Sequence, residues 1–183
     1  IVDDMLVYRV NEEEWFMVPN AANIDKDWAW MSQIADKMGM TLGVDFMNES
    51  EDWAQLAVQG PNALKAMQKL TDANVVDMEY YTFQIIKFAG VENIIFSTTG
   101  YTGAGGCEIY IPKAKAIDVW NAVFEAGKEY GIMPLVNARD EVKEAVASKD
   151  PEEIISSTRK IIIKEAVLLK ARKVTSIIGI MRK

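Results

Sequence analysis

The chain has 183 residues, half of them apolar and about a quarter charged, which is the composition of an ordinary globular protein. Its 20 basic and 27 acidic residues give a net charge of −7, although the segment 159–183 is strongly basic. An acidic body argues against a nucleic-acid surface, and no apolar run has the length of a membrane span or the pattern of a signal peptide.

The lack of histidine and the single cysteine restrict the chemistry available to the chain. Cys107 alone excludes an internal disulfide and a cysteine-based metal cluster, and a reducing, cytoplasmic setting is expected. We interpret Cys107 as a small buried hydrophobe in preference to a reactive thiol. Without histidine, catalysis would rest on carboxylates, tyrosine, lysine, arginine or backbone amides, and no metal is expected.

The first half of the chain alternates predicted strands and helices. Two strands, 4–10 and 15–18, precede a helix near 24–39, for which Asn23 is the expected N-cap and Gly39 the stop. The remaining predicted elements of this half are strands at 41–46 and 53–58 and a helix that opens at Gly60-Pro61.

The second half continues with a predicted helix at about 113–130, in which Ile117, Trp120 and Phe124 face inward. Three strands precede it, at 80–88, 91–97 and 107–111. Beyond residue 140 we expect a helix from Asp150-Pro151 to about Lys173 and a strand at 174–181. Antiparallel hairpins among helices predict an α+β fold, with helices packed on antiparallel sheets.

A glycine-rich stretch stands out at residues 97–108, which read STTGYTGAGGCE. Its four glycines let the backbone adopt positive φ and approach a ligand or another backbone closely. One interpretation is a long hairpin loop. The other is a binding turn that carries Tyr101 and Glu108. A phosphate loop is excluded because no Gly-Lys-Ser/Thr sequence closes the turn.

Five short motifs follow one another along residues 1–140. They are IVDDMLVYR at 1–9, VPNAAN at 18–23, LAVQGP at 56–61, GYTGAGGCE at 100–108 and ARD at 138–140. In this order they resemble the glycine cleavage system T-protein family of aminomethyltransferases. The resemblance implies a T-protein folate-binding core with ferredoxin-like subdomains. It also implies transfer of an aminomethyl group from lipoyl-bearing H-protein to tetrahydrofolate, which yields 5,10-methylenetetrahydrofolate and ammonia.

The resemblance assigns roles to residues at the matching positions. Asp4 corresponds to an acid that assists proton transfer at the reacting folate nitrogen. Tyr8 corresponds to a tyrosine near the pterin, and Asn20 to an asparagine that contacts folate. From the residues alone, Asp3-Asp4 would instead be a surface pair at a strand end.

The resemblance assigns roles to three further positions. Tyr101 is the tyrosine of the Gly-Tyr-Thr-Gly motif, and Glu108 is the glutamate that pairs with the amino edge of the pterin. Arg139 corresponds to an arginine near the folate tail. Taken singly, Glu108 would be an exposed strand residue and Arg139 an ordinary surface charge.

Residues 141–183 have no counterpart in the family pattern. Conversely, family members have a segment before the Asp-Asp motif that has no counterpart in this sequence. We therefore expect a truncated core at 1–140 joined to a helix-helix-strand segment at 141–183 that packs on it, in a chimera or engineered fragment. A diverged natural paralogue is the alternative origin. The alternative functions are a non-catalytic scaffold and a folate-dependent iron–sulfur assembly factor, whose cysteine motif has no counterpart here.

Overall fold

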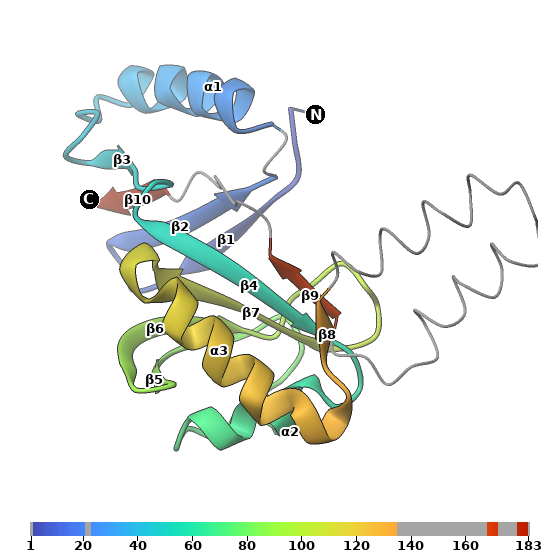
Figure 1. Ribbon diagram of the computed structural model, residues 1–183. Helices are drawn as coiled ribbons and strands as arrows, with labels where there is room; N and C mark the ends of the chain where they lie inside the picture. The colour runs from blue at the N-terminus through green and yellow to red at the C-terminus, as the bar shows by residue number, and fades with distance from the viewer. Residues whose placement is uncertain (1, 21–22, 135–167, 172–178, 183) are drawn as a thin grey trace, which may run out of the picture. The chain divides into compact units, whose positions relative to one another are not determined.

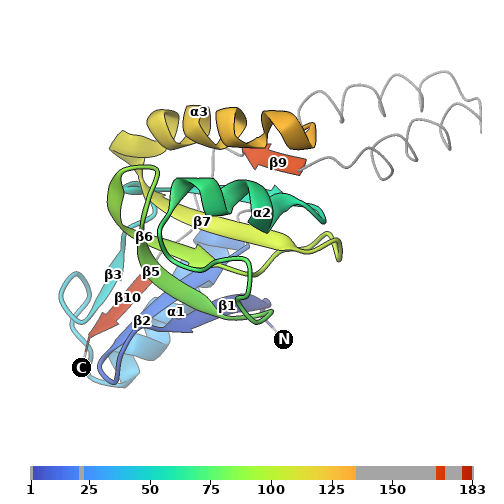
Figure 2. The same cartoon turned by 90° about the horizontal axis from the view of Figure 1, so that it is seen from below.

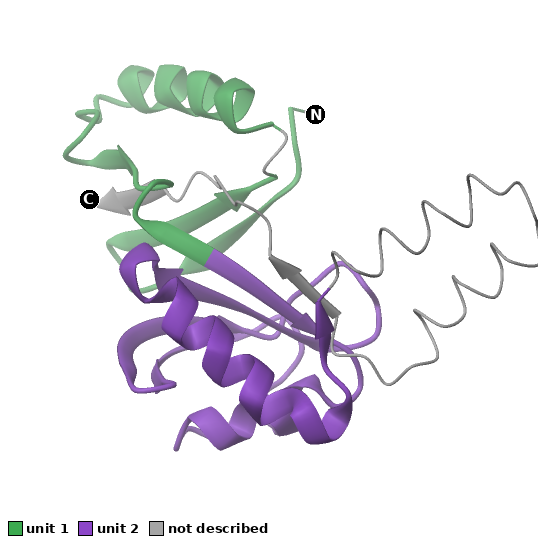
Figure 3. Ribbon diagram, in the orientation of Figure 1, with its two compact units in different colours: residues 1–54, 173–183 green, residues 55–172 purple. Residues whose placement is uncertain are grey.

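The computed structural model describes residues 2–20, 23–134, 168–171 and 179–182. The chain forms two compact units, one of residues 1–54 and 173–183 and the other of residues 55–172 (Figure 3). Both combine a β-sheet with helices, which confirms the predicted α+β class. None of the described helices has the length and apolar character needed to cross a membrane.

The first unit contains a four-stranded antiparallel sheet in the order β1-β2-β10-β3 (Figure 1). Its strands are β1 (Met5–Arg9), β2 (Glu14–Pro19), β3 (Phe46–Asn48) and β10 (Gly179–Arg182). Helix α1 (Ile24–Lys37) contributes Met31 and Trp28 to a small core around Phe46, whose ring stacks on Trp28 at 5.0 Å between centroids. Met31 and Trp28 thus belong to the core of the first unit.

The second unit contains a six-stranded sheet in the order β5-β6-β7-β4-β9-β8. Its strands are β4 (Trp53–Gln59, which starts in the first unit), β5 (Phe83–Phe88), β6 (Val91–Ser97), β7 (Gly106–Pro112), β8 (Met133–Pro134) and β9 (Leu168–Ala171). Helices α2 (Ala63–Met67) and α3 (Ala116–Gly127) pack against each other and against β7 (Figures 1 and 2). The pairing of β8 with β9 is parallel.

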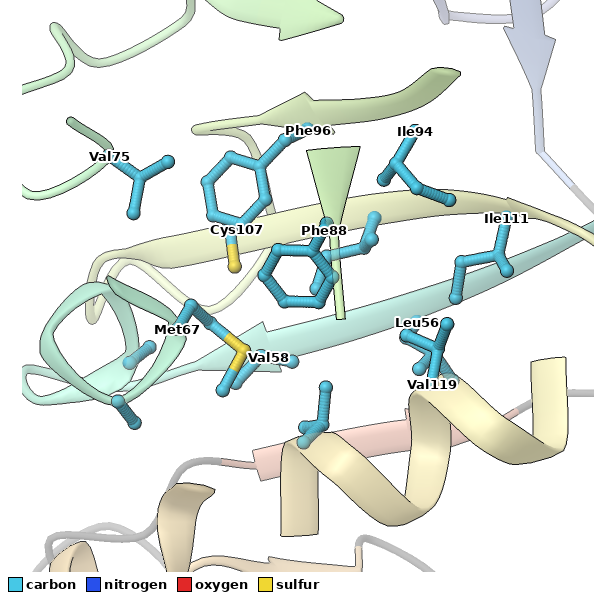
Figure 4. Packing of buried hydrophobic residues seen from close by; sticks show 14 residues of the cluster. Leu56, Val58, Met67, Val75, Phe88, Ile94, Phe96, Cys107, Ile111 and Val119 are labelled. Atoms are coloured by element: carbon cyan, nitrogen blue, oxygen red, sulfur yellow. The ribbon is translucent and has the colours of Figure 1, made fainter. Parts of the chain in front are cut away.

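Alternate residues of the central strands form the core of the second unit (Figure 4). Phe96 of β6, Ile109 of β7 and Val58 of β4 are completely buried, as is Val123 of α3. Each such side chain stabilises the fold by about 2 kcal/mol through removal of apolar surface from water. Cys107 lies in the same cluster, and burial raises the pKa of its thiol well above the ordinary value. The interpretation of Cys107 as a small buried hydrophobe is confirmed.

Two predicted strands begin later than expected because turns occupy their first residues. Residues 41–45 turn around the Thr41 carbonyl oxygen, which accepts the amides of Val44 and Asp45, and the Asp45 carboxylate accepts the Thr41 amide at 2.7 Å. Strand β5 starts at Phe83, since the backbone of Tyr81 has a left-handed φ of 69°. Local side-chain and turn hydrogen bonds outweigh strand propensity at these positions.

Two helix predictions also need correction. Ile117 was expected to face inward but is 75% exposed, because the buried stripe of α3 runs through Val119 and Val123. At about 100° per residue, that stripe lies on nearly the opposite side of the helix. Leu168–Ala171 forms strand β9 rather than the end of a helix, since its backbone pairs with β4 and β8. The rest of that predicted helix, and the proposed boundary at residue 140, lie outside the described residues.

Candidate functional site

Asp4 lies at the exposed start of β1, where its carboxylate is paired with the side-chain amide of Asn20. Asn20 Nδ2 donates to Asp4 Oδ1 at 2.7 Å and to the Asp4 carbonyl oxygen at 2.9 Å. The same nitrogen lies 3.2 Å from Oδ1 of Asp3, which also accepts the backbone N–H of Asp4 at 3.0 Å. Asn20 follows β2, and the pairing of Met5 with Pro19 brings it beside the start of β1. Asp4 is thus an accessible acid with a fixed orientation.

A third acid, Asp27 of α1, completes what we call the Asp4 cluster: Asp3, Asp4, Asn20 and Asp27. Asp27 is only 1% exposed and is hydrogen-bonded to Asp3. This hydrogen bond is the main cause that lowers the pKa of Asp3 to about 2, followed by the side-chain amide of Asn23. Burial raises the pKa of Asp27. Two carboxyl groups in contact repel each other when both are charged, which favours protonation of one of them.

The contact between Asn23 and Asp3 explains a difference at the start of α1. The helix begins directly after Asn23, as predicted, but the Asn23 side chain makes no capping hydrogen bond to the helix. It donates to Asp3 instead. The Asn23 side chain therefore contributes a hydrogen bond to the Asp4 cluster. The first backbone N–H groups of α1 must find their hydrogen bonds elsewhere.

Tyr8 lies on β1 four residues after Asp4, and its side chain is buried in the first unit. Its ring packs against Phe16 of β2, with centroids 5.9 Å apart, and Phe16 in turn meets the edge of Trp53 at 5.5 Å. The described surroundings of Tyr8 are thus those of a core aromatic. A role near the pterin stays a prediction.

Glu108 of β7 in the second unit is a buried carboxylate, 5% exposed, and not the exposed strand residue of the simpler interpretation. Thr99 Oγ1 donates to its Oε2 at 2.5 Å, and Gln55 Nε2 donates to its Oε1 at 3.0 Å. Gln55 Nε2 also lies 3.4 Å from the hydroxyl of Tyr110. We call Gln55, Thr99, Glu108 and Tyr110 the Glu108 cluster. Ser97 Oγ, 3.0 Å from Thr99 Oγ1, extends it along the end of β6.

The glycine-rich loop, residues 98–105 between β6 and β7, is tied to β4 by a buried side chain, that of Gln59 at the end of this strand. Gln59 Nε2 donates to the carbonyl oxygens of Thr99 at 3.1 Å and Cys107 at 3.0 Å. Its Oε1 accepts the hydroxyl of Thr102 at 3.0 Å. A single amide therefore satisfies the backbone at both ends of the loop and one side chain within it.

Two glycines are required by the close approach of Val58 and Gln59 of β4. A Cβ on Gly100, whose φ is +152°, would stand 2.0 Å from Gln59 Oε1. A Cβ on Gly106, whose φ is +131°, would stand 2.4 Å from the Val58 carbonyl oxygen. The first of the two interpretations of this stretch, a plain hairpin loop, is thus incomplete, since the loop is tied to β4 as well as to its own strands.

Aromatic side chains are exposed on and beside this loop. Tyr101 is 76% exposed at its tip. Tyr80 and Tyr81 are also exposed, with ring centroids 5.5 Å apart, and the Tyr81 amide donates to the carbonyl oxygen of Thr98 at 3.2 Å. A non-glycine residue at positive φ, such as Tyr81, is a mark of strain that often accompanies function.

The six residues selected from the sequence are thus divided between the two units. Asp4 and Asn20 are in direct contact in the first unit, and Tyr101 and Glu108 belong to the second. Arg139 lies outside the described residues. Each carboxylate can accept N–H groups, and the accessible Asp4 can also exchange protons. In the described part of the chain no group of three or more carboxylate or thiol side chains is placed to hold a metal ion.

The functional neighbours that sequence reasoning missed are polar residues at a distance along the chain. Gln59 lies in the LAVQGP motif, where a glutamine at the end of an apolar strand beside Gly60-Pro61 is unusual. This polar residue is the signal that could have identified it. The sequence around Gln55 and Thr99 has no unusual residue that would have identified them as partners of Glu108. Asp27 sits next to Lys26 on a helix of mixed charge, where an ordinary surface acid is expected.

The GCVT N-terminal domain family model matches residues 1–143 of the chain. Three similar proteins, each named aminomethyltransferase, come from Bacteroides fragilis, Flavobacterium psychrophilum and a Thermoanaerobacter species. They are 51%, 47% and 43% identical over 144, 144 and 145 residues, which is 78% of this chain each time. The match covers 38%, 39% and 38% of those proteins, so the chain spans about two fifths of their length.

Proposed function

Because this chain belongs to the GCVT N-terminal domain family, that of the glycine cleavage system T-proteins, we propose that it is the folate-binding part of an aminomethyltransferase. Tetrahydrofolate would supply the nitrogens that take up the aminomethyl carbon from the lipoyl arm of H-protein, with release of ammonia. The side chains of this chain would bind the folate and assist proton transfer.

The observation that carries the proposal is the buried carboxylate of Glu108. A carboxylate out of water, oriented by Thr99 and Gln55, suits the N–H edge of a planar heterocycle, since charge-assisted hydrogen bonds are stronger and shorter than neutral ones. We assign Glu108 to the amino edge of the pterin. The exposed ring of Tyr101 would cover a face of the ligand.

Asp4 is the proposed acid for proton transfer. It is accessible, and Asn20 fixes one of its oxygens, so the carboxylate can hold or release a proton at a defined place. In this assignment Asn20 orients Asp4 as well as contacting folate. Tyr8 would line the pterin side, and Arg139 would hold the acidic tail of the folate.

H-protein is the proposed macromolecular partner, since an aminomethyl group on its lipoyl arm is the donor in this family. A non-catalytic scaffold that keeps the fold and binds no folate is the competing function. The two differ in one measurable property, the affinity for folate, which does not require turnover.

Isothermal titration of the 183-residue chain with tetrahydrofolate under anaerobic conditions tests the proposal. We expect saturable binding, weakened at least about tenfold in Glu108→Gln, which replaces one carboxylate oxygen by a donor. Asp4→Ala should weaken binding as well. The matched controls are Glu12→Gln and Asp36→Asn, which remove one exposed acid each. No saturable heat up to millimolar ligand, or equal effects of site and control variants, would favour the scaffold.

A further inference from the structure

Asp27 is a buried acid for which the proposed chemistry has no use. Among the described residues, no backbone N–H, side-chain N–H or hydroxyl group donates a hydrogen bond to either carboxyl oxygen of Asp27 or to Oδ2 of Asp3. The ammonium of Lys26 donates to the carbonyl oxygen of Val2 at 2.7 Å and stands 3.7 Å from Asp27 Oδ1, where it opposes the rise in the pKa of Asp27 without outweighing burial. A buried carboxylate without donors is strongly disfavoured, so such a group takes up a proton.

A proton on Asp27 resolves the contact with Asp3. The two side chains are hydrogen-bonded, and two carboxylates offer only acceptors, so one must be the acid. Asp27 is the more deeply buried of the two, and burial is the main cause that raises its pKa. Asp3, which is partly exposed, also accepts the Asp4 amide and the Asn20 side chain, and these donors favour its charged form.

We propose that Asp27 is a positioning residue of the site: as a neutral acid it donates its O–H to Asp3, and Asp3 in turn anchors the Asn20 amide that orients the Asp4 carboxylate. The chain of contacts runs from α1, through the segment before β1, to the end of β2. This inference rests on the proposed function, in which Asp4 is the working acid.

The proposal gives the two members of the Asp3-Asp4 pair different tasks. Asp3 turns inward to Asp27 and Asn20, whereas Asp4 stays accessible. Neutralisation of Asp27 also leaves one negative charge instead of two beside Asp4. Among the described residues, the charged groups that face the pair are Lys26 and Asp4, together with the two members themselves.

A purely structural role for Asp27 would be that of a first-turn acid interacting with the dipole of α1. Asp25 occupies the same turn and is exposed, so it provides the matched control. A dipole role requires a charged carboxylate, whereas the proposed role requires a neutral donor. The two roles therefore predict opposite protonation states and opposite effects of an asparagine, which keeps an N–H donor but no charge.

The test is an NMR titration of the side-chain carboxyl carbons in the 183-residue chain, with Asp27→Asn, Asp27→Leu and Asp25→Leu. In the wild type the Asp27 signal should titrate above 3.8 and the Asp3 signal near 2. The Asn20 side-chain amide signal should shift with the same midpoint as Asp27. Two results in the wild type alone would overturn the proposal. One is a titration midpoint of Asp27 at or below the ordinary value of an aspartate, and the other is an Asn20 side-chain amide signal that does not shift with the Asp27 midpoint.

The variants separate positioning from simple packing. Asp27→Asn should keep the pKa of Asp3 low and leave the affinity for tetrahydrofolate within about threefold, because the donor is retained. Asp27→Leu should return the pKa of Asp3 toward its ordinary value and weaken binding about tenfold, the size of one lost hydrogen bond. Asp25→Leu should do neither. Equal behaviour of the asparagine and leucine variants would also overturn the proposal.

The two proposals fail in distinguishable ways. If the wild type binds no folate while Asp27 titrates high and the Asn20 amide follows it, the proposed function is wrong and the network stands. If folate binds and depends on Glu108 but not on the donor at position 27, the function stands and the positioning role is wrong.

Discussion

The Asp4 cluster and the Glu108 cluster each present a carboxylate, but they hold it by different means. Asp4 is exposed and is oriented by a chain of side chains from three segments of the first unit. Glu108 is buried in the sheet of the second unit, where Thr99 and Gln55 fix it. An exposed acid can trade protons with solvent, whereas a buried one keeps a defined set of partners. The difference agrees with the roles proposed for Asp4 in proton transfer and for Glu108 in recognition.

The chain provides a separate probe for each region. Its only cysteine, Cys107, is buried in the core of the second unit, so its reaction with a thiol reagent reports on that unit. Four of the five tryptophans, Trp15, Trp28, Trp30 and Trp53, belong to the first unit and dominate the fluorescence. The reactivity of Cys107 and the tryptophan fluorescence therefore report separately on the two units.

The largest effect is expected from truncation after residue 149. It removes β10, a central strand of the first sheet between β2 and β3, and β9, which pairs with β4 and β8. Unpaired inner strands expose backbone and apolar surface. We expect loss of the cooperative tryptophan transition in urea and aggregation on concentration. A soluble truncated chain with a cooperative tryptophan transition would show that the tail is dispensable.

Gly106→Ala should have the next largest effect, in the second unit. The new Cβ would collide with the Val58 backbone, and φ is unfavourable for alanine, so we expect a loss of about 3 kcal/mol in the free energy of unfolding. Cys107 should react faster. Gly103→Ala is the control, since φ is +66° there but the space is open, and about 1 kcal/mol is expected. If Gly106→Ala and Gly103→Ala lost equal free energy of unfolding, the backbone would have moved to relieve the clash with β4.

Gln59→Leu should cost about 2 kcal/mol by leaving the carbonyl oxygens of Thr99 and Cys107 without their donor. The loop should become more mobile, which protease cleavage near Tyr101 and weaker folate binding would reveal. Gln84→Leu on the exposed side of β5 is the control and should change neither. Unchanged cleavage in Gln59→Leu would show that the loop is held by other contacts.

The smallest effect concerns pH and the first unit. The pKa of Asp27 is raised above 3.8, so its contribution to stability is complete below that value and is lost as the pH rises through the raised value. Asp3, with a pKa of about 2, contributes above 3.8 and loses its contribution as the pH falls through about 2.

The stability of the wild type relative to Asp27→Asn should therefore decrease as the pH rises from about 4 towards neutrality, because the variant lacks the titrating acid. Tryptophan-monitored urea unfolding at several pH values measures this difference. A constant difference across the range would argue that Asp27 is charged throughout.

Local patterns in the sequence were sufficient for most elements, whereas the roles assigned to the residues of the candidate site stay predictions. The apolar spacing of α1, the hairpin of β1 and β2 and the glycine-rich loop were predictable because each depends on neighbours within a few residues. The failures at residues 41–45 and at Ile117 arose where a side chain or a helix rotation shifted the local pattern. The pattern alone could not weigh those competing contacts.

The sequence by itself determined the α+β class and the family, since strand and helix periodicity and ordered motifs are readable along the chain, and it singled out Asp4 and Glu108 as candidate acids. Only the tertiary structure decided what surrounds those acids. Asp3 meets Asp27 across 24 positions, and Gln59 meets Thr99 across 40. Such contacts depend on which elements pack together, and burial then sets the protonation and rigidity of each carboxylate.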